Sequence, residues 1–174
     1  MKKTISLFTI AFIAFQLSAQ STCEELRKEN EYLKKALLLN NPVIEVQNGD
    51  LKFSVVKVEG NSKSHLVTIE IIVKNTRRNI EAFAAKVKSI VDINGMEYQI
   101  DKAYIGLKDA TTFAFTDLRK NTPLKCRYVF KGVQPEVKAL RLFNYPVEYH
   151  IPGANAFDFE NKNAEFKNLS IVWN

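Results

Sequence analysis

Hydrophobic and polar residues alternate along most of the chain after residue 42, which is typical of half-buried β-strands. The clearest case is 67–73, where every odd position holds Val or Ile. Segments 96–101 and 124–131 alternate in the same way. By their β-branched and aromatic content, further strands are expected at 43–47, 51–58, 87–93, 137–144 and 165–173.

Turn residues separate most of these segments. Asn94-Gly95 lies between 87–93 and 96–101 and predicts a hairpin with a type I′ turn, whose two central residues need positive φ. About eight short strands without an intervening helix favour a mainly β, antiparallel sandwich. A barrel is the alternative. We expect residues 43–174 to form this single domain.

Two stretches of the body lack a regular pattern, at 106–123 and 146–156. Loops of this length in a compact domain are often functional. They carry the aromatic residues Phe113, Phe115 and Tyr149, which are our candidate ligand-binding residues. The alternative is an extra strand at 111–116 with both phenylalanines in the core.

The first 19 residues have the features of a secretory signal peptide. Lys2 and Lys3 precede an apolar run from Ile5 to Phe15, and small residues end at Ala19, where we expect cleavage. The run is too short for a stable membrane span, so no transmembrane segment is expected after signal removal. The mature protein is therefore expected in the periplasm, at the cell surface or outside the cell.

Residues 20–42 are expected to form a helix and a linker. Thr22 and Glu25 make a capping box, and Asn40-Asn41-Pro42 ends the helix. Five residues fall at heptad core positions: Cys23, Leu26, Asn30, Leu33 and Leu37. This pattern is typical of a short parallel coiled coil and predicts a homodimer. An amphipathic helix that packs on its own domain, or a solvated spacer, remains the alternative because the repeat is short.

The two cysteines leave several arrangements open. Cys23 can be free, joined to a second Cys23, bridged to Cys126, or lipidated, although the preceding Gln20-Ser21-Thr22 does not fit a lipidation box. Cys126 alternates inward with its neighbours, which indicates a buried, inert thiol. Neither His65 nor His150 lies in a catalytic motif, and no metal or cofactor motif is present, so we expect no cofactor and no enzyme activity.

The positive charge is spread along the chain. The formal charge of +6 includes two lysines of the signal peptide, so the mature chain carries +4. Lys125, Arg127 and Lys131 share one strand face and can form a basic stripe. Because an exported protein seldom meets nucleic acid, we expect none as partner. A protein or a component of the cell envelope is the expected partner, and anionic glycans are a weaker candidate.

Several segments resemble secreted immunoglobulin-like domains of unknown function. These are Val67-Thr68-Ile69-Glu70-Ile71, Asn121-Thr122-Pro123-Leu124 and Tyr128-Val129-Phe130-Lys131-Gly132-Val133. The closing Phe166–Trp173 segment and the Ala-Gln after the signal resemble exported proteins of Bacteroidota. The resemblance implies an immunoglobulin-like β-sandwich with an extracytoplasmic binding or assembly role and no established catalytic residues.

Together these features predict an exported, non-enzymatic binding or assembly module. One alternative is a carrier of a small apolar or glycan ligand held around Phe113, Phe115 and Tyr149. A small secreted hydrolase that uses His65 or His150 is the other alternative.

Overall fold

A computed structural model of the protein describes residues 26–28, 43–110, 115–155 and 158–174. Residues 26–28 are helical, and the rest of the expected signal peptide and heptad helix lies outside the described residues. Residues 42–174 form one compact unit. None of the helical residues described is part of a helix long and apolar enough to span a membrane.

The compact unit is built from strands, and its described residues contain no helix. Every pair of strands is antiparallel except β12 with β2, so the expectation of a mainly β, antiparallel fold is confirmed. Twelve strands are described where about eight were expected. They are β1 (Ile44–Asn48), β2 (Leu51–Asn61), β3 (Leu66–Asn75), β4 (Ile80–Ala85), β5 (Ser89–Asp92), β6 (Glu97–Ile105), β7 (Lys108–Asp109), β8 (Thr116–Leu118), β9 (Leu124–Lys131), β10 (Ala139–His150), β11 (Phe159–Ser170) and β12 (Val172–Trp173).

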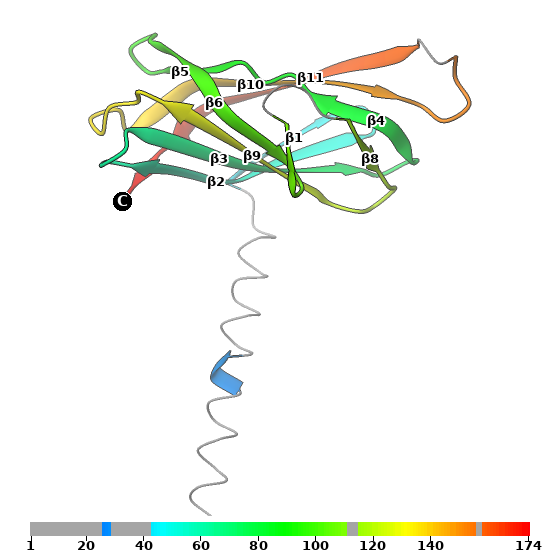
Figure 1. The fold of residues 1–174 in the computed structure, drawn as a ribbon, viewed down its shortest axis with the longest axis horizontal. Coiled ribbons are helices and arrows are strands. Elements are labelled where there is room, and N and C mark those ends of the chain that lie inside the picture. Colours follow the sequence, from blue (N-terminus) through cyan, green and yellow to red (C-terminus); the bar gives the residue numbers. More distant parts are fainter. Residues whose placement is uncertain (1–25, 29–42, 111–114, 156–157) are drawn as a thin grey trace, which may run out of the picture. The chain divides into compact units, whose positions relative to one another are not determined.

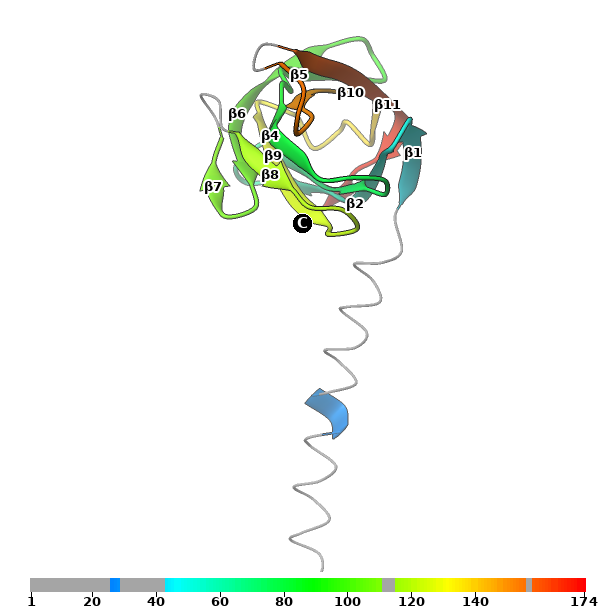
Figure 2. The same cartoon turned by 90° about the vertical axis from the view of Figure 1, so that its right-hand side faces the viewer.

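The strands form two facing layers (Figures 1 and 2). In the first layer β1 and β12 pair with β2, which is followed by β3, β9, β6 and β7. In the second layer β11 pairs with one side of β10, while β5 and β4 pair with its other side and β8 follows β4. The strand β6 joins the layers, because Ile100–Ile105 pairs with β9 and Glu97–Gln99 pairs with β5.

On the other side of the molecule, β1 and β11 lie side by side without a strand ladder (Figure 2). The side-chain amide of Asn48 donates a hydrogen bond to the main-chain carbonyl of Asn163 across this boundary, at 2.9 Å. We call the boundary between β1 and β11 the open seam. Among the described strands, the two layers are therefore joined by pairing along one side only.

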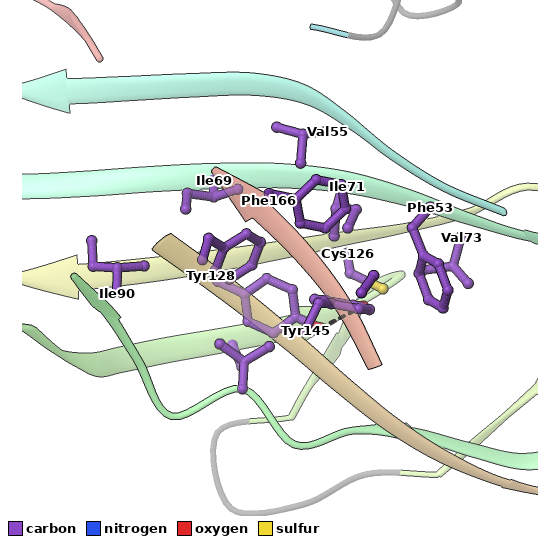
Figure 3. Close-up of a cluster of buried hydrophobic side chains, with 14 of the residues drawn as sticks. Phe53, Val55, Ile69, Ile71, Val73, Ile90, Cys126, Tyr128, Tyr145 and Phe166 are labelled. Atoms are coloured by element: carbon purple, nitrogen blue, oxygen red, sulfur yellow. Dashed lines mark hydrogen bonds between the residues drawn. The ribbon is translucent and has the colours of Figure 1, made fainter. Parts of the chain in front are cut away.

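Aromatic side chains fill the space between the layers (Figure 3). Phe53 of β2 meets Tyr145 of β10 edge to face, with ring centres 5.6 Å apart. Phe143 of β10 contacts Tyr128 and Phe130 of β9 at 6.3 and 6.2 Å. Because these contacts cross from one layer to the other, the fold is a sandwich with a solid core.

Strand β4 was not predicted because its buried residues do not alternate. Ala82 has φ +48°, and the pairing with β8 shifts between Ile80 and Phe83. After this bulge both Phe83 and Ala84 are buried, which breaks the period of two that identifies a strand in a sequence.

Strand β10 was predicted to end at Asn144, but it continues through Pro146 to His150. Proline interrupts a sheet when its missing N–H is needed for a ladder. The Pro146 carbonyl accepts the main-chain N–H of Lys86 at 2.8 Å, so this side of Pro146 faces the interval between β5 and β4. No strand partner there requires the missing donor, and β10 continues.

The Asn94-Gly95 hairpin is confirmed, but its turn is not type I′. Gly95 has φ +85°, whereas Asn94 is absent from the residues with positive φ. The N–H of Gly95 bonds to the carbonyl of Asp92, which is the pattern of a type I turn followed by a bulge. The buried Asp92 carboxylate accepts the N–H groups of Asn94 and Met96 and the Tyr98 hydroxyl. These bonds fix the turn.

We expect Asp92→Ala to lower the free energy of unfolding by about 1–3 kcal/mol at neutral pH, because three donors lose their acceptor. Burial alone would raise the pKa of Asp92, but the hydrogen bonds from Met96, Tyr98 and Asn94 outweigh it and lower the pKa. The stabilisation is therefore present above the unfolded-state pKa near 3.8 and is lost as the pH falls through the lower folded-state pKa. Urea titrations at pH 7 and pH 3 measure both effects.

The control is Asp158→Ala, at an exposed position of the β10–β11 hairpin. We expect it to leave both titrations unchanged. If Asp92→Ala were equally neutral at pH 7, the carboxylate would not hold the turn.

Candidate functional site

One end of the sandwich gathers the turn 48–50, the loops 76–79 and 119–123 and the β10–β11 hairpin (Figure 1). We call it the loop end. The main-chain N–H of Lys120 bonds to the Asn79 side chain at 2.8 Å, and the N–H of Asn121 bonds to the carbonyl of Asn75 at 2.7 Å. The guanidinium of Arg78 lies 3.4 Å from the Asp50 carboxylate. Polar contacts between different segments thus hold this end together.

Two phenylalanines are exposed at the loop end and contact one another. The ring centres of Phe115 and Phe159 are 6.0 Å apart, and the residues are 42% and 37% exposed. The ring of His150 lies 5.9 Å from Phe159, edge to face. We call Phe115, His150 and Phe159 the distal aromatic cluster. Large apolar side chains that meet on a surface are characteristic of interaction sites.

Polar groups fix the position of His150. Its Nε2 atom lies 2.9 Å from the carbonyl oxygen of Asn155, and its Nδ1 atom lies 3.8 Å from the carboxylate of Glu81. Glu81 precedes Ala82, whose positive φ belongs to the bulge in β4. Backbone strain of this kind is found where the surrounding structure positions a functional group.

A shallow hollow of about 520 Å³ adjoins Phe115. Its lining carries one aromatic side chain, one hydroxyl and two charges of each sign. The lining residues are Glu81, Ala82, Lys108, Phe115, Thr116, Asp117 and Arg119. An aromatic centre with charges around it can hold another macromolecule by apolar contact and polar bonds at its edge.

The sequence-predicted ligand residues separate in the structure. Phe115 is at the surface, whereas Tyr149 is 4% exposed and belongs to the core. The Tyr149 hydroxyl donates to the Glu160 carboxylate at 2.7 Å, and burial, followed by that carboxylate, raises its pKa. Phe113 lies outside the described residues. The extra strand expected at 111–116 is described only as β8, Thr116–Leu118, and Phe115 is not a core residue.

Sequence reasoning missed Phe159 and the bulge at Ala82. Phe159 was assigned neither to a strand nor to a loop of interest, although the Pro152-Gly153 turn before it marks a hairpin. No sequence pattern identifies Ala82 as a residue with positive φ.

The described residues bring together no catalytic constellation. His65 lies in the β2–β3 turn, at the opposite end of the sandwich from His150. No group of three His, Cys, Asp or Glu residues among the described positions is arranged to hold a metal ion.

The Cys126 thiol is buried in a small polar network inside the core (Figure 3). The hydroxyls of Tyr128 and Tyr145 are 2.9 Å apart and also contact this thiol. Burial raises the pKa of Cys126 to about 11, while the two tyrosine contacts act in the opposite direction. Cys126 is free, as expected of an inert core residue. Cys23 lies outside the described residues.

We therefore expect Cys126 to resist thiol reagents in the native state. Only the thiolate reacts, and a pKa near 11 leaves about one thiolate in a thousand at pH 8. In a Cys23→Ser background, a chromogenic disulfide reagent should show almost no reaction at pH 8 and one equivalent in denaturant. If one equivalent of thiol reacted rapidly in the native protein, the core would have to open readily at β9.

The predicted basic stripe on β9 is largely paired. Lys125 contacts Glu70 at 2.6 Å, and Lys131 contacts Asp101 at 3.3 Å. The Arg127 guanidinium lies 4.4 Å from the centre of the Tyr104 ring. These pairs leave a mixed surface in place of a uniformly positive one.

Comparisons with known proteins give structural similarities only. No family model matches, and no curated protein matches by sequence. The yeast GGA1 GAE domain has a TM-score of 0.45 and 15% identity, over 70% of this chain and 94% of that one. The secreted protein MPT63 of Mycobacterium tuberculosis has a TM-score of 0.35 and 10% identity, over 78% and 92%. The fimbrial subunit MyfA of Yersinia enterocolitica has a TM-score of 0.34 and 10% identity, over 68% and 98%.

Proposed function

We propose that the protein is an exported, non-enzymatic binding module that takes a protein partner at the loop end. The observation that carries this proposal is the exposed contact between Phe115 and Phe159. Aromatic side chains dominate the binding energy of many protein interfaces, particularly where polar groups surround them. The distal aromatic cluster has this arrangement, with Glu81, Asp117 and Arg119 beside it.

The geometry of the loop end favours a macromolecule over a small molecule. The hollow beside Phe115 is shallow, whereas sites for small ligands enclose most of the ligand surface. Loops on a rigid β scaffold commonly carry binding residues. A partner that covers both phenylalanines would remove their apolar surface from water.

The binding test uses purified mature protein as bait in an envelope extract. We expect the double variant Phe115→Ser plus Phe159→Ser to capture at least about tenfold less of the partner than the wild type, because two aromatic contacts are removed. The matched control is Leu107→Ser, which changes a fully exposed apolar residue in the β6–β7 turn. A partner that is retained by the double variant does not use this site.

Export is part of the proposal and depends on the first 19 residues. We expect the purified protein to begin at Gln20, which its mass will show. A mass that corresponds to the full chain in the soluble cell fraction would contradict export.

We also propose that residues 22–40 pair two chains. The support is the heptad pattern and the single described helical turn, in which Leu26 is 59% exposed. We expect wild-type mature protein to sediment as a dimer. The double variant Leu26→Asp plus Leu33→Asp should sediment as a monomer, since each Asp would bury a charge in the coiled-coil interface. A monomeric wild type would remove this part of the proposal. A non-reducing gel tests separately for a Cys23–Cys23 disulfide.

A further inference from the structure

A second hollow, of about 500 Å³, lies beside the open seam and shares no lining residue with the hollow beside Phe115. Its lining has three side-chain amides, two lysines and a proline, and no acidic residue. The lining residues are Asn48, Lys86, Pro146, Val147, Asn161, Lys162 and Asn163. We propose that this hollow binds an acidic saccharide chain.

The two lysines differ in what surrounds them. The Lys86 ammonium is paired with the Glu148 carboxylate. The Lys162 ammonium has no carboxylate within ion-pair distance among the described residues. Its Cε lies 3.9 Å from the position that a Cβ would take at Gly49, so the side chain reaches over the β1–β2 turn. Lys162 therefore offers an uncompensated positive charge to the hollow.

Two acidic residues that neighbour Gly49 or Lys162 in the sequence have other partners. Asp50 contacts the guanidinium groups of Arg77 and Arg78 at 3.7 and 3.4 Å. The Glu160 carboxylate accepts a hydrogen bond from the hydroxyl of Tyr149. A ligand carboxylate or sulfate would thus meet Lys162 without competition from a protein carboxylate.

The amides supply the donors and acceptors that hydroxyl groups need. The side chain of Asn48 is oriented by its bond to the main-chain carbonyl of Asn163, and the side chain of Asn163 by its 3.4 Å bond to the Asn144 side-chain oxygen. The side chain of Asn161 has no hydrogen-bond partner among the described residues. An amide donates and accepts at once, as the neighbouring hydroxyls of a sugar do, whereas an acidic peptide mainly needs donors.

The free edge of β11 adds main-chain groups to the same place. The Asn163 carbonyl faces the open seam, where it accepts a hydrogen bond from the side-chain amide of Asn48. Main-chain groups of alternate residues point the same way in an antiparallel strand, so the N–H and C=O of Asn161 also face the seam. None of the described strands pairs with them. The ring of Pro146 provides a small apolar surface against which a sugar ring can lie.

Titration calorimetry with the mature protein tests this inference, at about 150 mM salt so that loose charge attraction is screened. The probes are an oligogalacturonate, a sulfated heparin-derived oligosaccharide, a neutral malto-oligosaccharide and a short oligoglutamate. We expect one of the acidic saccharides to bind and the neutral saccharide and the peptide to bind at least about tenfold more weakly. Which acidic saccharide binds distinguishes carboxylate from sulfate recognition.

Variants show whether binding occurs at this hollow. We expect Asn161→Ala and Lys162→Gln each to weaken binding of the acidic saccharide about tenfold, the effect of one lost charge-assisted or well-aligned hydrogen bond. The matched control is Lys167→Gln on the same strand, whose lysine is paired with Glu165 outside the hollow. It should change the affinity less than twofold. The Trp173 emission and the melting temperature of each variant verify that it is folded.

Three results would overturn the inference: no binding of either acidic saccharide, equal binding of oligoglutamate or of the neutral saccharide, or equal losses in Lys162→Gln and Lys167→Gln. The hollow contains none of the three residues of the distal aromatic cluster. Phe115→Ser plus Phe159→Ser should leave saccharide binding intact, so failure at one site is distinguishable from failure at the other.

Discussion

Phe143→Ala should lower the free energy of unfolding by about 3–5 kcal/mol, the largest effect that we expect from a single substitution. Phe143 is fully buried and contacts four aromatic rings, which belong to Tyr128, Phe130, Tyr145 and Phe166. Two of these rings lie in the opposite layer. Removal of the side chain therefore leaves a cavity between the two layers. Relaxation of one layer alone cannot fill this cavity.

Urea unfolding followed by circular dichroism measures this loss. The matched control is Phe159→Ala, the same change on the neighbouring strand at an exposed position, where we expect a loss of less than about 1 kcal/mol. A loss below about 1.5 kcal/mol in Phe143→Ala would contradict a tightly packed interface between the layers.

The second large effect is expected at Gly60, where β12 pairs with β2. A Cβ built on Gly60 would lie 2.2 Å from the ring of Trp173. The Trp173 indole N–H donates to the carbonyl of Val137 at 2.7 Å, and the main-chain N–H of Asn174 bonds to the carbonyl of Gly60. The ring is therefore held in place, and Gly60→Ala must displace it.

We expect Gly60→Ala to cost about 2–3 kcal/mol, the upper range for an overpacked site, because β12 separates from β2 when the ring moves. Trp173 is the single tryptophan of the chain, so a shift of its emission to longer wavelength reports the displacement directly. The control is Gly153→Ala, where φ is +87° and no atom lies near the added methyl group. That variant should lose about 1 kcal/mol through backbone strain and keep the wild-type emission. An unchanged emission in Gly60→Ala would show that the indole does not rest on Gly60.

The sequence allowed the strands with a regular period to be predicted. Segment 67–73 alternates because it crosses the core between two partners and buries one face, and the structure has it as β3. The hairpin at Asn94-Gly95 was located correctly because glycine is needed at the position with positive φ. Its turn type was not, since the buried Asp92 carboxylate, and not the Asn-Gly pair alone, determines the conformation.

The errors arise where three-dimensional context overrides a local pattern. The bulge at Ala82 hid β4, and Pro146 is tolerated in β10 because the neighbouring strand is interrupted there. Neither condition is visible in the residues themselves. The immunoglobulin-like character and the coiled coil remain predictions.

The candidate site was only partly predictable. Phe115 was selected as an aromatic residue in an irregular segment, and the structure exposes it. Tyr149 was selected on the same grounds but points into the core, because β10 continues six residues beyond Asn144, where its pattern ended. The partner of Phe115 is Phe159, and their contact depends on how β8 and the β10–β11 hairpin approach each other at the loop end.

Photo-crosslinking in living cells tests the central claim most directly. A photoreactive phenylalanine analogue at position 115 should form one discrete adduct with an extracytoplasmic protein, and Phe159→Ser should diminish that adduct. The same analogue at Lys63, in the β2–β3 turn at the opposite end, should form none. Equal crosslinking at both positions, or no adduct at position 115 in exported protein, would contradict a binding site at the loop end.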